Sequence, residues 1–293
     1  MKILVFLLII ISRSISANEL TLYFFPSPYK FDWDSPQTLA RSVLKNSYLP
    51  TKFLFRHALG HVSTEIKCED GFYHLSGMTT KEKSEDVELL LNKKIGLGIM
   101  FYPMKGKLQS EIEVRSDLRD RYKKGKMNWL TFKIKSSTCE RLKSYIQEYK
   151  SQNLDSVYGL VFNPRKKEGA GCSAFGISLL ELSGLLTDEF KTEFAQRLYI
   201  NNDLNGYNGS TDKASFYKIL AGLNSRDWAQ DTFTGKELFF WRPNKMYEWV
   251  KNKIRKVSKM NLRNYEIIKR GNTFGLKIDK THVGTPNGPI FIK

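Results

Sequence analysis

Cys172 is the residue best placed in this sequence to act as a nucleophile. It follows the turn-forming run Gly169-Ala170-Gly171, and apolar residues then recur at helical spacing from Phe175 to Leu186. Cys172 is therefore predicted at a helix N-terminus, where unpaired N–H groups and the helix dipole favour the thiolate. The backbone amides of Cys172 and Ser173 would then form an oxyanion hole. The alternative is a buried structural cysteine behind a glycine-rich turn.

Two histidines are candidates to assist this thiol. A nucleophilic cysteine needs a base, and the base needs an orienting partner. His61 lies in an alternating strand-like run at 60–66, and His74 lies in a second strand-like run at 72–77. A turn separates the two runs. In a hairpin these positions become cross-strand neighbours, so one imidazole can contact the sulfur while the other orients it. Each histidine alone is also compatible with an ordinary hydrogen-bonded strand residue.

A zinc site is a third interpretation of the same histidines. His57, His61 and His74 offer three imidazoles, which are good zinc ligands. No second cysteine or carboxylate with motif spacing accompanies them, so we predict neither a metal site nor a cofactor.

The N-terminal residues have the pattern of an export signal. Lys2 precedes the apolar run 3–11, and small residues follow at Ser14 and Ser16. The run is too short to span a membrane, so residues 1–16 are predicted to be a signal peptide, with an uncleaved anchor as the alternative. We therefore expect an exported protein, periplasmic or secreted.

Three cysteines remain in an exported chain, which leaves one thiol unpaired. Cys68 ends a strand-like run and Cys139 opens a helix-like run. A Cys68–Cys139 disulfide would leave Cys172 free, which is the hypothesis we adopt.

The chain is strongly basic, with a formal net charge of +17. Removing residues 1–16 deletes Lys2 and Arg13 and lowers this charge to +15. A basic exported protein favours acidic surroundings, such as anionic lipids or cell-wall polymers. Short basic clusters such as 123–126 are usually solvated faces, and no nucleic-acid recognition motif is present, so no nucleic-acid partner is expected.

Hydrophobic periodicity and turn residues predict a mixed chain of strands and helices. Strands are expected at 20–25, 53–55, 60–66, 72–77, 98–102, 107–114, 128–134, 265–268, 274–278 and 290–292, and helices at 37–46, 84–92, 139–150, 175–186, 188–199, 213–223 and 244–256.

The order of these features resembles a known family. A strand bearing Gly60-His61-Val62, a second polar residue at His74 and a cysteine at a helix start, Cys172, are similar to the circularly permuted papain fold. That group includes NlpC-like hydrolases and lecithin–retinol acyltransferase-like enzymes. The resemblance covers roughly residues 50–190. Gly171 departs from it, because many bacterial relatives have Asn immediately before the nucleophile.

This resemblance implies an α+β fold in which an antiparallel sheet packs against the helix carrying the cysteine. It also implies that Cys172 is the nucleophile, His61 the general base and acid, and His74 the orienting residue. The expected domains are a signal peptide at 1–16, a permuted papain-like catalytic domain at 17–200 and a C-terminal extension at 201–293.

The function expected on this basis is an exported thiol hydrolase. It would cleave an amide or ester bond of a cell-envelope substrate through an acyl-enzyme, with a peptidoglycan peptide or a lipid acyl group as its substrate. The alternatives are a non-catalytic envelope-binding protein on the same fold and a lipid acyltransferase. Nothing in the sequence fixes the oligomeric state.

Overall fold

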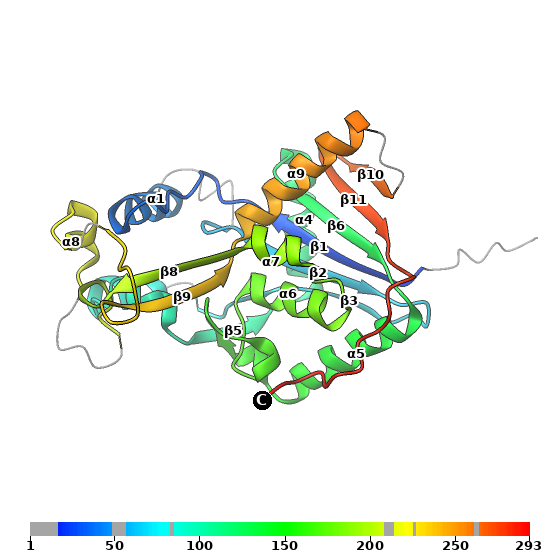
Figure 1. The fold of residues 1–293 in the computed structure, drawn as a ribbon, viewed down its shortest axis with the longest axis horizontal. Helices are drawn as coiled ribbons and strands as arrows, with labels where there is room; N and C mark the ends of the chain where they lie inside the picture. Colours follow the sequence, from blue (N-terminus) through cyan, green and yellow to red (C-terminus); the bar gives the residue numbers. More distant parts are fainter. Residues whose placement is uncertain (1–16, 49–56, 83–84, 208–213, 225–226, 261–263) are drawn as a thin grey trace, which may run out of the picture.

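The computed structural model describes six segments of the chain: residues 17–48, 57–82, 85–207, 214–224, 227–260 and 264–293. The predicted signal peptide, 1–16, and the strand expected at 53–55 lie outside the described residues. The fold is mixed α+β, as expected, with helices on both faces of a central sheet (Figure 1).

The central sheet has six strands, in the order β10-β11-β6-β1-β2-β3. Neighbouring strands run antiparallel, except that β11 pairs in parallel with β6. The strands are β1 (Glu19–Phe25), β2 (His61–Lys67), β3 (Tyr73–Ser76), β6 (Asn128–Lys133), β10 (Tyr265–Arg270) and β11 (Thr273–Asp279).

Both faces of this sheet are buried, and each faces a different cluster of apolar residues. Successive side chains in a strand point to opposite faces, so β2 presents Val62 and Ile66 to the larger cluster. On β1, Tyr23 and Phe25 point to the smaller cluster, which Trp129 of β6 joins. His61 is paired with Phe25 across the two strands and lies on that second face.

Four helices cover the face of the larger cluster, and three of them lie in front of the sheet in Figure 1. They are α5 (Ser136–Ser151), α6 (Cys172–Leu182), α7 (Asp188–Phe194) and α9 (Pro243–Met260). Helix α6 approaches β2 closely because it has a glycine there. A Cβ built on Gly176 would lie 2.9 Å from Val62 Cγ1, so any larger residue would push the helix away.

Among the described residues, one helix, α4 (Glu111–Lys124), covers the opposite face and lies behind the sheet in Figure 1. Its ends are well defined. Ser110 and Glu113 form a reciprocal capping box, and Gly125 ends the helix in the left-handed conformation. Val114 and Leu118 pack against the smaller cluster.

The remaining elements form a second lobe beside the sheet. An antiparallel pair, β8 (Ala195–Asn201) and β9 (Gly235–Trp241), packs with α1 (Pro36–Tyr48) and α8 (Phe216–Ala221) around its own apolar cluster. A three-stranded sheet has the order β4-β5-β7. The short elements are β4 (Met78–Thr80), α3 (Glu85–Val87), η1 (Glu88–Asn92), η2 (Leu97–Phe101), β5 (Met104–Leu108), η3 (Leu154–Ser156), β7 (Val157–Tyr158), η4 (Pro164–Lys166) and η5 (Asn202–Leu204).

The boundary expected at residue 200 does not divide the structure. Strand β8 crosses that position and pairs with β9, while β11 extends the central sheet by pairing with β6. Helix α9 supplies Met246 and Val250 to the larger cluster. Residues 201–293 therefore complete the same core instead of forming an appended extension.

Cys68 and Cys139 form a disulfide, and Cys172 is free. The bridge ties the end of β2 to the first turn of α5. The pairing adopted from the sequence is therefore present in the structure.

Some expected elements differ from the structure. A short 3-10 helix, Leu97–Phe101, stands where a strand was expected at 98–102, and the strand expected at 107–114 ends at Leu108, before helix α4 begins. The helix expected at 188–199 gives way to β8 at Ala195, and no strand forms at 290–292. Within the described segments, no helix combines the length and apolar character needed to span a membrane.

Candidate functional site

Cys172 lies where the sequence placed it, at the first residue of α6, with Gly171 as the N-cap. The residue is only 6% exposed. The backbone amides of Val62, Ser173 and Cys172 itself donate hydrogen bonds to the sulfur, and the Tyr158 hydroxyl is its side-chain partner. The two amides expected to form an oxyanion hole, those of Cys172 and Ser173, thus face the thiol itself.

The pKa of this thiol is raised. Burial is the largest cause, and it outweighs the amide and hydroxyl hydrogen bonds, which act in the opposite direction. The thiol is therefore predominantly protonated near neutral pH, which is unfavourable for a nucleophile.

His61 lies on the other face of the sheet from α6. Its ring is stacked on Phe25 and on His57, with ring centroids 5.9 and 4.0 Å away, and its Nε2 is 2.7 Å from Gln109 Oε1. The residue of β2 that contacts the sulfur is Val62, through its backbone amide, and the Val62 side chain faces α6 at Gly176. Because adjacent side chains in a strand point in opposite directions, the His61 side chain points away from α6.

His74 lies on the Cys172 side of the sheet, but at the far end of β2. It is paired with Ile66, four residues along the strand from Val62. Burial, helped by Lys150, lowers the pKa of His74 to about 4. Its Nε2 is buried without a hydrogen-bond partner among the described residues, so this nitrogen orients no group there.

The structure therefore does not bring Cys172, His61 and His74 together. The roles assigned to the two histidines are not supported by this geometry, because each contacts a different part of the molecule. The zinc interpretation meets the same difficulty, since His74 is separated by the sheet from His57 and His61. Within the described segments, no group of three or more potential ligands is arranged to bind a metal ion.

His61 instead belongs to a buried polar cluster between the sheet and α4. His57 Nε2 is 3.0 Å from Asp117 Oδ2, and the pKa of His61 is lowered by burial and then by His57. Arg121 lies over the Phe25 ring in the same region. The imidazole of His61 is thus neutral and firmly held.

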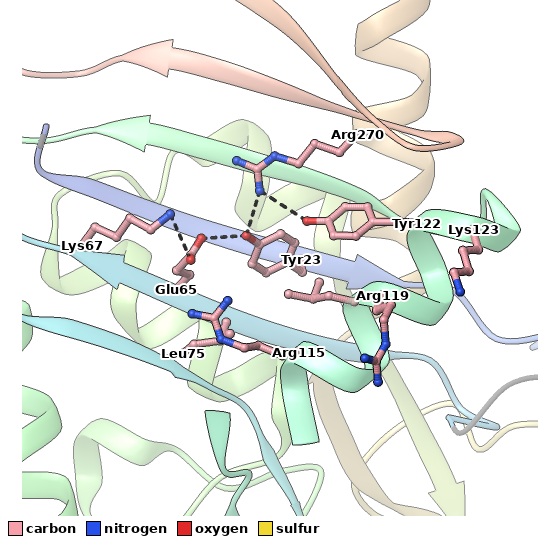
Figure 2. Close-up of a pocket in the computed structure, with 10 residues that line it drawn as sticks. Tyr23, Glu65, Lys67, Leu75, Arg115, Arg119, Tyr122, Lys123 and Arg270 are labelled. Atoms are coloured by element: carbon pink, nitrogen blue, oxygen red, sulfur yellow. Dashed lines mark hydrogen bonds and ion pairs between the residues drawn. The ribbon is translucent and has the colours of Figure 1, made fainter. Parts of the chain in front are cut away.

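A basic pocket lies on this same face, further along the sheet (Figure 2). Its volume is about 470 Å³. The sheet supplies its floor and α4 and β10 supply its walls, as Figure 2 shows. The lining residues are Tyr23, Glu65, Lys67, Leu75, Arg115, Leu118, Arg119, Tyr122, Lys123 and Arg270.

Hydrogen bonds neutralise the single carboxylate of the pocket. Tyr23 donates to Glu65 Oε2 at 2.7 Å and Tyr73 to Oε1 at 3.0 Å, while Lys67 Nζ lies 3.1 Å from Oε1. Burial raises the pKa of Glu65, but these partners outweigh it and leave the pKa lowered. Burial and the Glu65 charge raise the pKa of Tyr23, which keeps its phenol a donor. Glu65 and Lys67 thus form a compensated pair.

The remaining cations of the pocket carry an excess of positive charge. Arg115 is paired with Glu111 at 2.6 Å. Within the described residues, Arg270, Arg119 and Lys123 have no carboxylate partner; Arg270 donates instead to the hydroxyls of Tyr23 and Tyr122. Such a surface attracts anions.

The pocket was not predicted from the sequence, because helix α4 was not predicted. That helix carries Arg115, Arg119, Tyr122 and Lys123, in a stretch assigned partly to a strand. The signal was present: Ser110 and Glu113 have capping-box spacing, and Gly125 follows the last helical residue. With the helix recognised, Arg119 and Lys123 fall four residues apart on one face.

Comparison with family models, with curated proteins and with solved structures finds no match for this chain. The assignment of a function therefore rests on the geometry alone.

Proposed function

We propose that this protein is a non-catalytic binding protein of the cell envelope that holds an anionic ligand in the basic pocket. One observation carries the proposal: five cationic side chains and one compensated carboxylate surround a single cavity of about 470 Å³. This was the alternative to a hydrolase in the sequence analysis, and the buried, protonated thiol of Cys172 favours it.

Other features of the chain fit this proposal. The formal charge, +17 for the full chain and +15 without residues 1–16, favours an anionic partner, and anionic polymers and lipids are abundant in cell envelopes. The proposal includes export through the predicted signal peptide at residues 1–16. It requires no cofactor and no nucleic-acid partner.

Binding of a polyanion by matched charge variants tests this function. We expect the mature chain to bind fluorescently labelled polyglutamate and polyphosphate, and R119Q/K123Q to weaken both. The variant K256Q/K259Q removes the same charge from exposed positions on α9, which covers the opposite face of the sheet. Equal losses in the two double variants would show that net charge, and not the pocket, drives binding.

We also propose that the α+β fold is a permuted papain-like fold. The order of elements supports it: the strand pair β2–β3 precedes the cysteine-bearing helix α6, and α6 packs on β2. Helix α9 and strands β10 and β11 would then be additions that complete the sheet. An experimental structure that aligns with permuted papain-like proteins over β2, β3 and α6 is the test.

A thiol hydrolase or lipid acyltransferase is the second candidate. Three backbone amides and the Tyr158 hydroxyl converge on the Cys172 sulfur at a helix start, and such donors stabilise a thiolate or an oxyanion. This candidate requires a rearrangement that exposes the thiol and supplies a base. Its substrate would be a peptidoglycan peptide or a lipid acyl group.

A cysteine-directed acylating probe distinguishes the two functions. Mass spectrometry of the folded, disulfide-intact protein would find a labelled Cys172 in an acyl-enzyme, and Y158F would change the labelling rate. We expect no labelling of the folded protein.

A further inference from the structure

We infer that residues 284–293, here called the strap, hold the loop 163–171 closed beside Cys172, and that release of the strap makes this thiol accessible to solvent. The strap comes after β11 and runs along α5, where it is drawn in red in Figure 1. Access to Cys172 is separate from anion binding in the basic pocket, so this device goes beyond the proposed binding function.

The strap lies on the surface of the molecule. It contains no helix or strand, and each of its residues is half-buried or exposed. Its residues Thr285, Gly288 and Phe291 contact the α5 side chains Ser137, Thr138, Arg141 and Tyr145. A surface segment of this kind opens more readily than a strand or helix of the core.

Arg165 joins the strap to the loop. Its guanidinium donates to the carbonyl oxygens of Pro289 and Ile290, and its own carbonyl oxygen accepts a hydrogen bond from the amide of Ile292 at 2.8 Å. Glu181 of α6 lies 3.0 Å from Nη1 of the same guanidinium. Arg165 is buried, and charge-assisted hydrogen bonds are strong where water is excluded. The strap therefore fixes the tip of the loop.

Phe291 makes a second connection between the strap and the loop. The centroid of its ring lies 5.4 Å from that of Tyr145 on α5, and Nζ of Lys167 in the loop lies 5.1 Å from the same centroid. The tip of the loop is also bonded within itself, because the Asn163 amide donates to Glu168 Oε2 at 2.9 Å. We therefore expect the tip to move as one unit when the strap leaves.

The other half of the loop packs against the stretch of chain that carries Tyr158. Residues 169–171 lie directly on 157–159, and a Cβ built on Gly171 would lie only 2.8 Å from a carbonyl oxygen of that stretch. The Tyr158 hydroxyl is the side-chain partner of the Cys172 sulfur. Movement of the loop away from this stretch would therefore separate the hydroxyl from the thiol.

Release of the strap would have a local effect. The tip of the loop would keep its ion pair with Glu181 and lose its contacts with Pro289, Ile290 and Phe291. Solvent would then reach Cys172 through opening of the loop, while the sheet and α6 stay in place. Because local opening requires less free energy than global unfolding, the strap would set the rate at which the thiol is exposed.

Labelling of Cys172 with a thiol-specific reagent, in full-length variants, tests the strap. F291A removes the ring between the loop and α5. R165K keeps a positive charge opposite Glu181 but loses the fork that binds two carbonyl oxygens. Each should speed labelling of the folded, disulfide-intact protein by about tenfold, the factor expected for the loss of a charge-assisted hydrogen bond or a ring contact.

Two control variants separate local opening from other effects. F233A makes the same substitution at a ring that is 91% exposed, in the loop before β9, and should leave the labelling rate unchanged. S110A weakens α4 on the opposite face of the sheet, so it measures how far global destabilisation alone speeds labelling. Hydrogen exchange of F291A should become faster in residues 157–171 and stay unchanged in α4.

Labelling of F291A and R165K that is faster than that of S110A, at an equal or smaller loss of stability, supports the strap. Parental labelling rates in both variants would overturn it. Rates that simply follow the unfolding midpoint, as in S110A, would overturn it too, because global unfolding would then expose the thiol. Polyglutamate binding should be the same in all these variants, so failure of the strap and failure of the binding function can be distinguished.

Discussion

Burial decides what Cys172 can do. The same helix start that offers amide hydrogen bonds to the sulfur also removes it from water, and desolvation outweighs the amides. The helix start predicted from the sequence favours a thiolate, but in the folded protein the burial of Cys172 disfavours it. The Tyr158 hydroxyl and the Val62 backbone amide of β2 already contact the sulfur.

Thiol reactivity in the folded protein follows from this burial. We expect Cys172 to react with a thiol-specific reagent at pH 8 roughly a hundredfold more slowly than in the denatured protein, because an opening that costs about 3 kcal/mol reduces the reactive population by that factor. Absorbance after adding the reagent, with and without denaturant, measures this. The variant C172A should release no signal while the disulfide is intact. A rapid reaction in the folded state would instead favour the hydrolase.

His74 makes stability depend on pH. Its folded pKa of about 4 is below the ordinary histidine pKa of 6.5, so the unfolded chain binds more protons between these values. The stabilisation is complete above about pH 6.5 and is lost as the pH falls towards 4. We expect H74L to remove about 2 kcal/mol of the stability difference between pH 7 and pH 5. Urea unfolding of both proteins at each pH measures it.

The effect of His74 on the pH dependence of stability can be separated from that of His61. The pKa of His61 is also lowered, so the parent protein loses stability on acidification from both residues. Only the difference between the parent and H74L reports on His74. An identical pH dependence in the two proteins would show that His74 is solvated in the folded state.

Helix α4 is the element on which the basic pocket depends. Its N-terminus is fixed by the capping box of Ser110 and Glu113. We expect S110A to lower the free energy of unfolding by about 1 kcal/mol, because a backbone amide loses its acceptor. Ser215 begins α8 without a side-chain cap hydrogen bond, so S215A is the matched control and should change stability far less. Equal effects would mean that the capping hydrogen bond is not formed in solution.

Elements with a strong hydrophobic period were predictable from the sequence. The helices at 139–150 and 244–256 and the strands at 20–25 and 128–134 were predicted within a few residues, because each shows a clear apolar stripe or run. Helix α4 has no such stripe: it is mostly charged, and only four of its side chains are buried. Its packing depends on contacts with sheet residues that are distant in sequence. Because most of its residues are charged, no apolar stripe indicates the helix in the sequence.

The site was less predictable than the fold. Cys172 was placed correctly at a helix start, but its expected contact with the histidines is not formed. Side chains alternate along β2, so His61 points to the opposite face of the sheet from α6. Val62 and His61 are adjacent, and which of them faces α6 depends on how the whole sheet is covered. The pocket residues come from β1, β2, β3, α4 and β10, and no short motif contains them.

At the scale of the whole molecule, one covalent bond joins distant parts of the core. The Cys68–Cys139 bridge spans 71 residues of sequence and connects the β2–β3 hairpin region to α5. Restriction of the unfolded chain by a loop of this length corresponds to about 4 kcal/mol. We therefore expect C68A/C139A to unfold at clearly lower denaturant concentration.

A reducing agent provides the internal control for this prediction. It should destabilise the parent protein and leave C68A/C139A unchanged, because Cys172 forms no disulfide. Denaturant unfolding with and without reductant measures both effects. A parent protein insensitive to reductant would indicate that the bridge is absent in solution.

The parallel pairing of β11 with β6 has a consequence for biosynthesis. Strand β6 leaves the ribosome long before β11, so one edge of the growing sheet stays open until almost the whole chain has emerged. Arg270 arrives in that same final portion. A nascent or prematurely terminated chain therefore lacks one arginine of the basic pocket and exposes an unpaired strand, so chaperone capture should concentrate on chains that stop before residue 264.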